Sequence, residues 1–279
     1  AYGFGVGAPN SNGWRGAYNY KSIQNNFNPA LGFVNQRGME DHALDAGYRQ
    51  FLPTGSFVRS WYGGFDGYRS TNTNTGDLIS EIVDLRMNVN NNTNDVVSAS
   101  VTRQREVLTR NFTIYRSADG SRSIVIPPGD YSFTQTAVGI NFGGQRDWSG
   151  RISLSAGDYY NGESFQRSGN VTWQAKPGYT FQVNYTENDI ELLQGDFTVR
   201  QLSFTSLINF TPFLAWSNRI QYDNVSERIG INSRLAWVPE AGREAYLVLN
   251  WGMVDPEKDN KFSSTNADLT LKYNYTFRF

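Results

Sequence analysis

Apolar and polar residues alternate along much of this chain with a period of two. In the last eleven residues, 269–279, the sequence LTLKYNYTFRF sets Leu, Leu, Tyr, Tyr, Phe and Phe against Thr, Lys, Asn, Thr and Arg. A period of two places successive side chains on opposite faces of a β-strand. We therefore expect a strand with one apolar and one polar face, ending on the carboxyl-terminal Phe279.

The same alternation recurs throughout the chain, separated by breaks rich in Pro, Gly, Asn and Asp, and no segment has the period of a helix. The pattern predicts about fourteen strands, with sixteen as the alternative count. Strands are expected at 13–24, 39–51, 57–69, 77–90, 95–109, 131–145, 147–158, 164–176, 178–191, 197–211, 213–225, 228–238, 244–254 and 266–279. Tyr2, Phe4 and Val6 form either an extra strand or the tail of a removed region.

The polar face carries charge in the middle of strands, as at Asp84, Arg86 and Arg234. A soluble sandwich would turn these charges to solvent, and a membrane barrel would turn them to its lumen. Aromatic residues gather near strand ends, as at Trp148 and Trp237, where amphipathic rings favour membrane interfaces. Lipid allows no open strand edge. We therefore predict an all-β fold, a closed antiparallel transmembrane β-barrel, that occupies residues 1–279 as one domain.

Composition narrows the alternatives. Mean hydropathy is −0.52 and the chain has no run of 18 apolar residues, which excludes a transmembrane helix but not membrane-spanning strands. The net charge of −1 gives no bias toward nucleic acid. Short turns at 176–178 and 239–242 predict tight hairpins at one end. Polar stretches at 70–77, 157–166, 187–195, 223–228 and 255–264 predict longer loops at the other end.

Several phrases resemble an uncharacterised family of bacterial outer-membrane proteins. They are NNFNPALGFVNQRG at 25–38, IPPGDYSF at 126–133, IQYDNVSERIGINSRLAWVPEAG at 220–242, and the terminal strand. In that family a barrel domain of unknown function follows a module similar to carbohydrate-binding family nine. The resemblance implies an outer-membrane location in a Gram-negative-type bacterium. It also implies that this chain is the C-terminal part of a longer precursor, whose upstream sugar-binding-like module is a possible partner.

The terminal strand also resembles the C-terminal signal of bacterial outer-membrane proteins. That resemblance implies recognition by the barrel-assembly machinery and assigns the signal to four aromatic residues, Tyr273, Tyr275, Phe277 and Phe279. Outer-membrane lipid is the other expected partner, and nucleic acid is not expected.

Eleven charged residues are predicted to point into the lumen. They are Arg15, Lys21, Asp45, Arg49, Asp84, Arg86, Arg151, Arg219, Arg234, Lys272 and Arg278. Rings of charge inside a pore set its selectivity. The alternative is that these residues pair across strands and fill the lumen as a static network. If the lumen is open, its excess of arginine favours anions or anionic sugars.

No residue pattern indicates a catalytic, metal or cofactor site. His42 is the single histidine, and no nucleophile motif accompanies it. Asp255, Glu257, Asp259 and Asn260 offer oxygen ligands, but their spacing does not match a calcium-binding loop. We expect a porin-like passage for small polar solutes or the membrane anchor of an upstream module. The alternatives are a plugged barrel that binds a partner without transport and, after it, a barrel enzyme that depends on His42.

Overall fold

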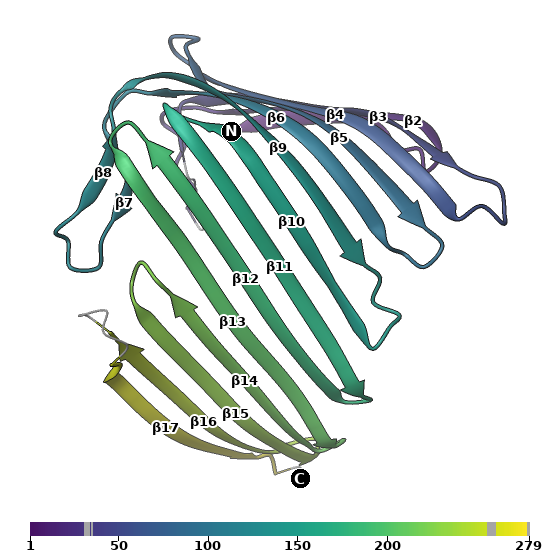
Figure 1. Ribbon diagram of the computed structural model, residues 1–279, viewed down its shortest axis with the longest axis vertical. Coiled ribbons are helices and arrows are strands. Elements are labelled where there is room, and N and C mark those ends of the chain that lie inside the picture. The colour runs from purple at the N-terminus through teal and green to yellow at the C-terminus, as the bar shows by residue number, and fades with distance from the viewer. Residues whose placement is uncertain (31–33, 35, 256–260, 278–279) are drawn as a thin grey trace.

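The computed structural model describes residues 1–30, 34, 36–255 and 261–277 of the chain. These residues form one large antiparallel sheet of fifteen strands, in the order β1-β2-β3-β4-β5-β6-β9-β10-β11-β12-β13-β14-β15-β16-β17, and a separate two-stranded hairpin, β7-β8. Each strand of the large sheet pairs with its neighbours in the chain, so the sheet is a meander. Figure 1 shows that it curves into a long trough, with β2–β6 along one side and β14–β17 along the other.

The strands are long, and most of them have more than ten residues. The first nine are β1 (Tyr2–Ala8), β2 (Gly13–Ile23), β3 (Met39–Phe51), β4 (Val58–Asn72), β5 (Leu78–Asn91), β6 (Val96–Leu108), β7 (Phe112–Arg116), β8 (Ser123–Ile126) and β9 (Gly129–Phe142). The remaining eight are β10 (Trp148–Tyr159), β11 (Gly162–Lys176), β12 (Tyr179–Leu192), β13 (Gly195–Thr211), β14 (Leu214–Asp223), β15 (Arg228–Glu240), β16 (Arg243–Val254) and β17 (Ser263–Tyr275).

All fourteen strands expected from the alternation are present, and the structure adds three. β1 is the possible extra strand at Tyr2, Phe4 and Val6. The hairpin β7–β8 was not predicted, because its strands have only five and four residues and fall below the length at which a period of two is visible. The described residues form no helix long and apolar enough to cross a membrane.

The two faces of the sheet differ in chemistry and in exposure. One face carries large apolar side chains that are open to the surroundings, such as Trp14 at 72 % and Leu271 at 74 % exposed. The other face carries most of the polar residues and also the buried apolar and aromatic side chains of the sheet, among them Tyr62 at 4 % and Phe133 at 5 % exposed. Curvature exposes the convex face and shields the concave one. The polar face is therefore concave, and the apolar face is convex.

Aromatic side chains follow the convex face along the end of the sheet where the turns are short. Trp14 lies edge-on to Tyr48 with their ring centres 5.2 Å apart, and Trp148 stacks on Trp173 at 5.1 Å. Further exposed aromatic residues continue this row toward the carboxyl terminus. They are Phe210, Trp216, Trp237, Tyr273 and Tyr275. The sequence predicted aromatic rings at strand ends, and this prediction is confirmed for the short-turn end.

The expected asymmetry of the two ends is also present, with one correction. The turns at 177–178, 212–213 and 241–242 each have two residues, whereas the opposite end carries the long connections 24–38 and 109–128. The stretches 157–166 and 187–195 were expected to be loops on that opposite end. Each is instead mostly strand with a two-residue turn, at 160–161 or 193–194, because β10 and β12 run to Tyr159 and Leu192 while β11 and β13 begin at Gly162 and Gly195.

The hairpin β7–β8 packs onto the concave face near the turn between β12 and β13. Ile124 forms a buried cluster with Ile190 and Phe197, and the Tyr115 ring stacks on Phe197 at 4.7 Å. The guanidinium of Arg122 donates a 2.5 Å hydrogen bond to the carbonyl of Asp196. Apolar burial between the hairpin and the sheet therefore holds the 109–128 connection against the loop end of the concave face.

The large sheet has two edges among the described residues, β1 and β17, and these two strands do not pair with each other. Consecutive strands alternate in direction. In a meander of fifteen strands the first and last therefore run in the same direction. This parity matters for how the trough could close, because antiparallel closure requires an even number of strands.

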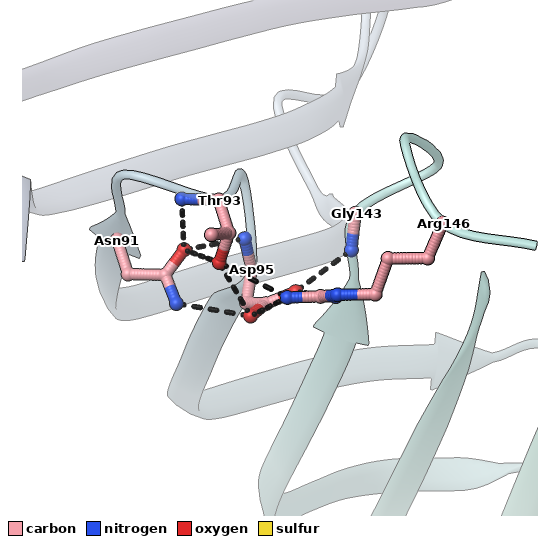
Figure 2. A network of polar contacts seen from close by, with 5 residues as sticks. All are labelled: Asn91, Thr93, Asp95, Gly143 and Arg146. Atoms are coloured by element: carbon pink, nitrogen blue, oxygen red, sulfur yellow. Dashed lines mark hydrogen bonds and ion pairs between the residues drawn. The ribbon is translucent and has the colours of Figure 1, made fainter. Parts of the chain in front are cut away.

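A polar clamp joins two turns at the short-turn end (Figure 2). The carboxylate of Asp95, in the β5–β6 turn, accepts hydrogen bonds from Arg146 Nη1 at 2.6 Å and Nη2 at 2.8 Å, and from the backbone N–H of Gly143 at 2.9 Å. Asn91 and Thr93 donate to the same carboxylate, each at 2.9 Å. These donors, Arg146 first, hold the pKa of Asp95 well below its usual range. The clamp ties β5, β6, β9 and β10 together.

We expect Asp95→Asn to destabilise the folded protein in a pH-dependent way. A carboxylate with a lowered pKa contributes stability above its unfolded pKa of about 3.9, and this contribution is lost as pH falls toward the folded pKa. The midpoint of urea unfolding should therefore drop for Asp95→Asn at pH 7, and the difference between wild type and variant should shrink at pH 3. The turn variant Asp77→Asn is the matched control, and equal midpoints for Asp95→Asn and wild type at pH 7 would contradict the clamp.

Candidate functional site on the concave face

Cross-strand register places the predicted lumen residues on a common face. Arg15 is opposite Gly47, Gly47 opposite Gly64, and Gly64 opposite Arg86, so Arg15 and Arg86 point the same way. The same reasoning, carried from strand to strand, puts every described member of the set on the polar, concave face. These members are Arg15, Lys21, Asp45, Arg49, Asp84, Arg86, Arg151, Arg219, Arg234 and Lys272. Arg278 lies outside the described residues.

On β2–β5 four of the charged residues form a paired network. Arg86 Nη2 donates to Asp45 Oδ2 at 3.0 Å and to Asp66 Oδ1 at 2.8 Å, and its Nη1 forms an ion pair with Asp66 Oδ2. Arg15 Nη2 reaches the other oxygen of Asp45 at 3.5 Å. These residues come from four consecutive strands, so the network spans β2 to β5. Two arginines and two aspartates cancel in charge.

Tyr62 lies at the centre of this network and is almost fully buried. The guanidinium carbons of Arg15, Arg49 and Arg86 lie 5.9, 5.5 and 5.7 Å from the centre of its ring, within the range of cation–π attraction. The ring runs along the sheet over Gly47 and Gly64, and a Cβ at either glycine would overlap the phenol. The two glycines thus provide the space in which Tyr62 lies flat beneath three cations.

On β10–β17 the concave cations are arranged differently. Within the described part of the chain, Arg151, Arg219 and Lys272 make no ion pair, and Arg234 instead stacks on Tyr246 with its guanidinium carbon 4.3 Å from the ring centre. The predicted set therefore contains both paired and unpaired charges. Arg15, Asp45 and Arg86 pair across strands, whereas Lys21, Arg49 and the concave cations of β10–β17 make no ion pair within the described residues.

Two adjoining clefts hollow the concave face between β12 and β17. One has a volume of about 360 Å³ and is lined by residues such as Asn184, Ser203 and Arg228. The other has a volume of about 280 Å³ and is lined by residues that include Arg219, Asn232 and Asn250. Gln221 and Gly230 line both clefts. This hollow is mostly lined by amides and hydroxyls and holds two of the arginines without an ion pair.

Other residues singled out in the sequence lie away from these clefts. His42 is on the convex, apolar face, where its Nδ1 and the Tyr18 hydroxyl share a 2.7 Å hydrogen bond. Of the four aromatic residues of the terminal signal, Tyr273 and Tyr275 lie on β17, and Tyr275 packs on Phe277 with ring centres 4.6 Å apart. Phe279 lies outside the described residues, as do Glu257, Asp259 and Asn260. No group of three metal-binding side chains occurs in the part of the chain that the structure describes.

Sequence reasoning missed several residues that shape this face. Asp66 and Tyr62 lie in the phrase WYGGFDGYRS, and strict alternation through it would have placed both with Arg86 on the polar face. The glycines in that phrase weaken the strand signal. Arg228 and Gln221 flank a turn, and their approach to Gly230 depends on the pairing of β14 with β15. No local pattern reveals that hollow.

We expect Gly47→Ala to destabilise the protein by about 1–3 kcal/mol, the usual cost of inserting a methyl group into a filled space. The cost should fall in a Tyr62→Ala background, because the methyl group then has room. Gly63→Ala is the control on the opposite face, since the nearest atom to its added Cβ is 3.9 Å away on Trp61. Urea unfolding of wild type, Gly47→Ala, Tyr62→Ala and the double variant forms a double-mutant cycle, and a zero interaction energy would rule out this contact.

No family model and no curated protein matches this chain. The resemblance drawn from its phrases therefore stays an expectation. The chain is assigned by its architecture alone, as an all-β protein built on a fifteen-stranded antiparallel meander.

Proposed function

We propose that this chain is an outer-membrane β-barrel that gives small polar solutes, above all anions, a passage across the outer membrane of a Gram-negative-type bacterium. The observation that carries the proposal is the continuous convex face of exposed apolar residues on a sheet whose concave face is charged. An apolar surface of this extent is not stable in water and marks contact with lipid or protein. A polar interior beneath it is what a passage for polar solutes requires.

The dimensions of the apolar face fit a bilayer. On β10 it runs from Trp148 to Ala156, about 27 Å along the strand at 3.4 Å per residue. At a strand tilt of about 40° this run gives a band about 21 Å tall, close to the apolar band of about 25 Å in outer-membrane barrels. Aromatic rings bound the face at the short-turn end. At the loop end, ion pairs replace apolar residues on the same face, as between Arg167 Nε and Glu187 Oε1 at 3.1 Å.

The number of strands limits how the barrel can close. The strands β2–β6 and β9–β17 number fourteen, so β2 and β17 run in opposite directions and can pair as antiparallel neighbours. We infer that the closed barrel joins β17 to β2 and that β1 gives up its place on β2. A sixteen-stranded barrel would need a further strand between β1 and β17.

A cysteine cross-link tests this closure, since the chain has no cysteine of its own. We expect Leu271→Cys on β17 to form a disulfide with a cysteine scanned along β2, at Trp14, Tyr18 or Tyr20. A disulfide needs Cβ atoms about 4 Å apart, so only paired strands react. Cysteines at Phe4 and Val6 on β1 provide the comparison. Cross-linking to β1 and not to β2 would contradict the fourteen-stranded barrel.

A plugged or anchoring barrel is the second candidate, and the hairpin β7–β8 favours it. The hairpin already covers the loop end of the concave face near Ile190 and Phe197. In that case the barrel would hold a partner, such as an upstream sugar-binding-like module, and would conduct no ions. An enzymatic role is not part of the proposal. His42 faces the apolar side, where it shares a hydrogen bond with the hydroxyl of Tyr18.

Conductance across a planar bilayer distinguishes the two candidates. We expect discrete current steps from the detergent-folded chain, with a reversal potential on the chloride side under a KCl gradient. The triple variant Arg151→Gln, Arg219→Gln, Lys272→Gln should move the reversal potential toward the potassium side, because it removes cations without ion pairs. Its control is Arg86→Gln with Asp66→Asn, which removes a neutral pair. Insertion without current would favour the plugged barrel, and a reversal potential near zero in the wild type would contradict anion preference.

A further inference from the structure

The two clefts on β12–β17 make one hollow with a common floor. Gly230 forms this floor at the point where the clefts meet, and a Cβ built on it would find no atom within 4 Å. Its cross-strand partner on β16 is Gly252, so two adjacent strands lack a side chain at the same level. The Asn266 side chain covers Gly252, and the space above Gly230 is left open.

Two arginines lie on either side of this floor. Arg219 is opposite Asn232, and Arg228 lies four residues before Asn232 on the same strand, with Gly230 midway. At 3.4 Å per residue, and with strands about 4.8 Å apart, the two Cα atoms are about 14 Å apart. Extended guanidinium groups from both can reach toward the floor. Neither arginine makes an ion pair within the described residues.

The carboxylate of Asp223, which lies beside Arg228, already accepts hydrogen bonds from other groups. Asp223 is the cross-strand partner of Arg228, yet its Oδ1 accepts hydrogen bonds from the backbone N–H groups of Val225 at 2.9 Å and Ser226 at 2.7 Å. Its Oδ2 faces Gln201 Nε2 at 3.5 Å. The carboxylate thus stabilises the β14–β15 turn. The residues that line the two clefts include two arginines and one acid, so the lining itself has a net positive charge.

The remaining lining is uncharged and can both donate and accept hydrogen bonds. Asn184 Nδ2 donates to Ser203 Oγ at 3.1 Å, and Asn232 Nδ2 donates to Asn250 Oδ1 at 2.5 Å. These bonds orient the side chains and leave the second amide proton of each asparagine available. Gln221 makes no side-chain hydrogen bond within the described residues, so both its donor and its acceptor are available. Amides of this kind match hydroxyl groups, which also donate and accept.

We propose that this hollow binds a small hydroxyl-rich anion, of the class of sugar acids and sugar phosphates. Arg219 or Arg228 would hold the anionic group, since guanidinium groups pair with carboxylate and phosphate through two parallel hydrogen bonds. Gln221 and the asparagines would bind the hydroxyl groups, and the space above Gly230 would hold the ring. The inference rests on the proposed function, because it places the hollow on the lumenal face and assigns a solute class to the passage.

The test is equilibrium binding to the detergent-folded chain by saturation-transfer NMR, which does not require conduction. The probes are glucuronate, glucose 6-phosphate, glucose and acetate. We expect at least one of the two hydroxylated anions to bind about tenfold more tightly than glucose, because its charged group gains hydrogen bonds from an arginine that glucose cannot make at the same strength. It should also bind more tightly than acetate, which has no hydroxyl groups. Comparison of glucuronate with glucose 6-phosphate distinguishes the carboxylate from the phosphate.

Three variants locate the binding. Arg219→Gln and Arg228→Gln should together remove the preference for the anion, and Gly230→Leu should abolish binding of every hydroxylated probe by filling the floor. Arg110→Gln makes the same charge change in the 109–128 connection and should leave binding unchanged. Gel migration with and without heating checks that each variant folds as a barrel.

Two results would overturn the inference. The first is equal affinity for glucuronate, glucose 6-phosphate and glucose, which would mean that the charge is not recognised. The second is equal affinity for the two hydroxylated anions and acetate, which would mean that the hollow is an ion site only. If chloride is conducted in either case, the proposed passage stands without this site. Specific binding of a hydroxylated anion to a chain that conducts no current would support the hollow and would overturn the passage.

Discussion

The alternation of side chains across an extended backbone is the constraint on which the rest of this structure depends. Because the period is two, each strand has a fixed choice of which residues face the trough, and a slip of one residue would exchange the two faces completely. The long strands hold their register through ten or more consecutive pairs, as between β11 and β12 or between β12 and β13. The apolar convex face, the aromatic row and the charged concave face all follow from this one register.

The concave face divides into two walls with different electrostatics. On β2–β5 Arg15 and Arg86 pair with Asp45 and Asp66 beside the buried ring of Tyr62. On β10–β17 the polar side chains are mainly amides and hydroxyls, and the arginines lack acidic partners among the described residues. Pairing limits what a charge can offer to a solute, since its hydrogen bonds are already used. The second wall is accordingly where we place the chemistry of the proposed passage.

The sequence predicted the strands well because each strand repeats one simple rule over many residues. All fourteen expected strands are present. The described residues that were predicted to face a lumen share the polar face. The short strands β7 and β8 were not predicted, because each has too few residues for a period of two to be visible. The only local signal for this hairpin is the turn at Asp119-Gly120 between two apolar runs. The pairing of Arg86 with Asp66 and the hollow above Gly230 depend on contacts between strands. Such contacts follow from register and side-chain length together, which no single segment contains.

The difference between the two walls also sets how each responds to dissolved salt. Ions in solution screen charges that face water over a distance of about 8 Å at physiological ionic strength, and they act weakly on charges already held in contact. The network around Tyr62 would thus keep its shape from dilute to concentrated salt. The open arginines of the opposite wall would lose much of their long-range attraction over the same range. The wall on β2–β5 would then keep the same contacts at every salt concentration. The electrostatic attraction of the wall on β10–β17 would weaken as the ionic strength rises.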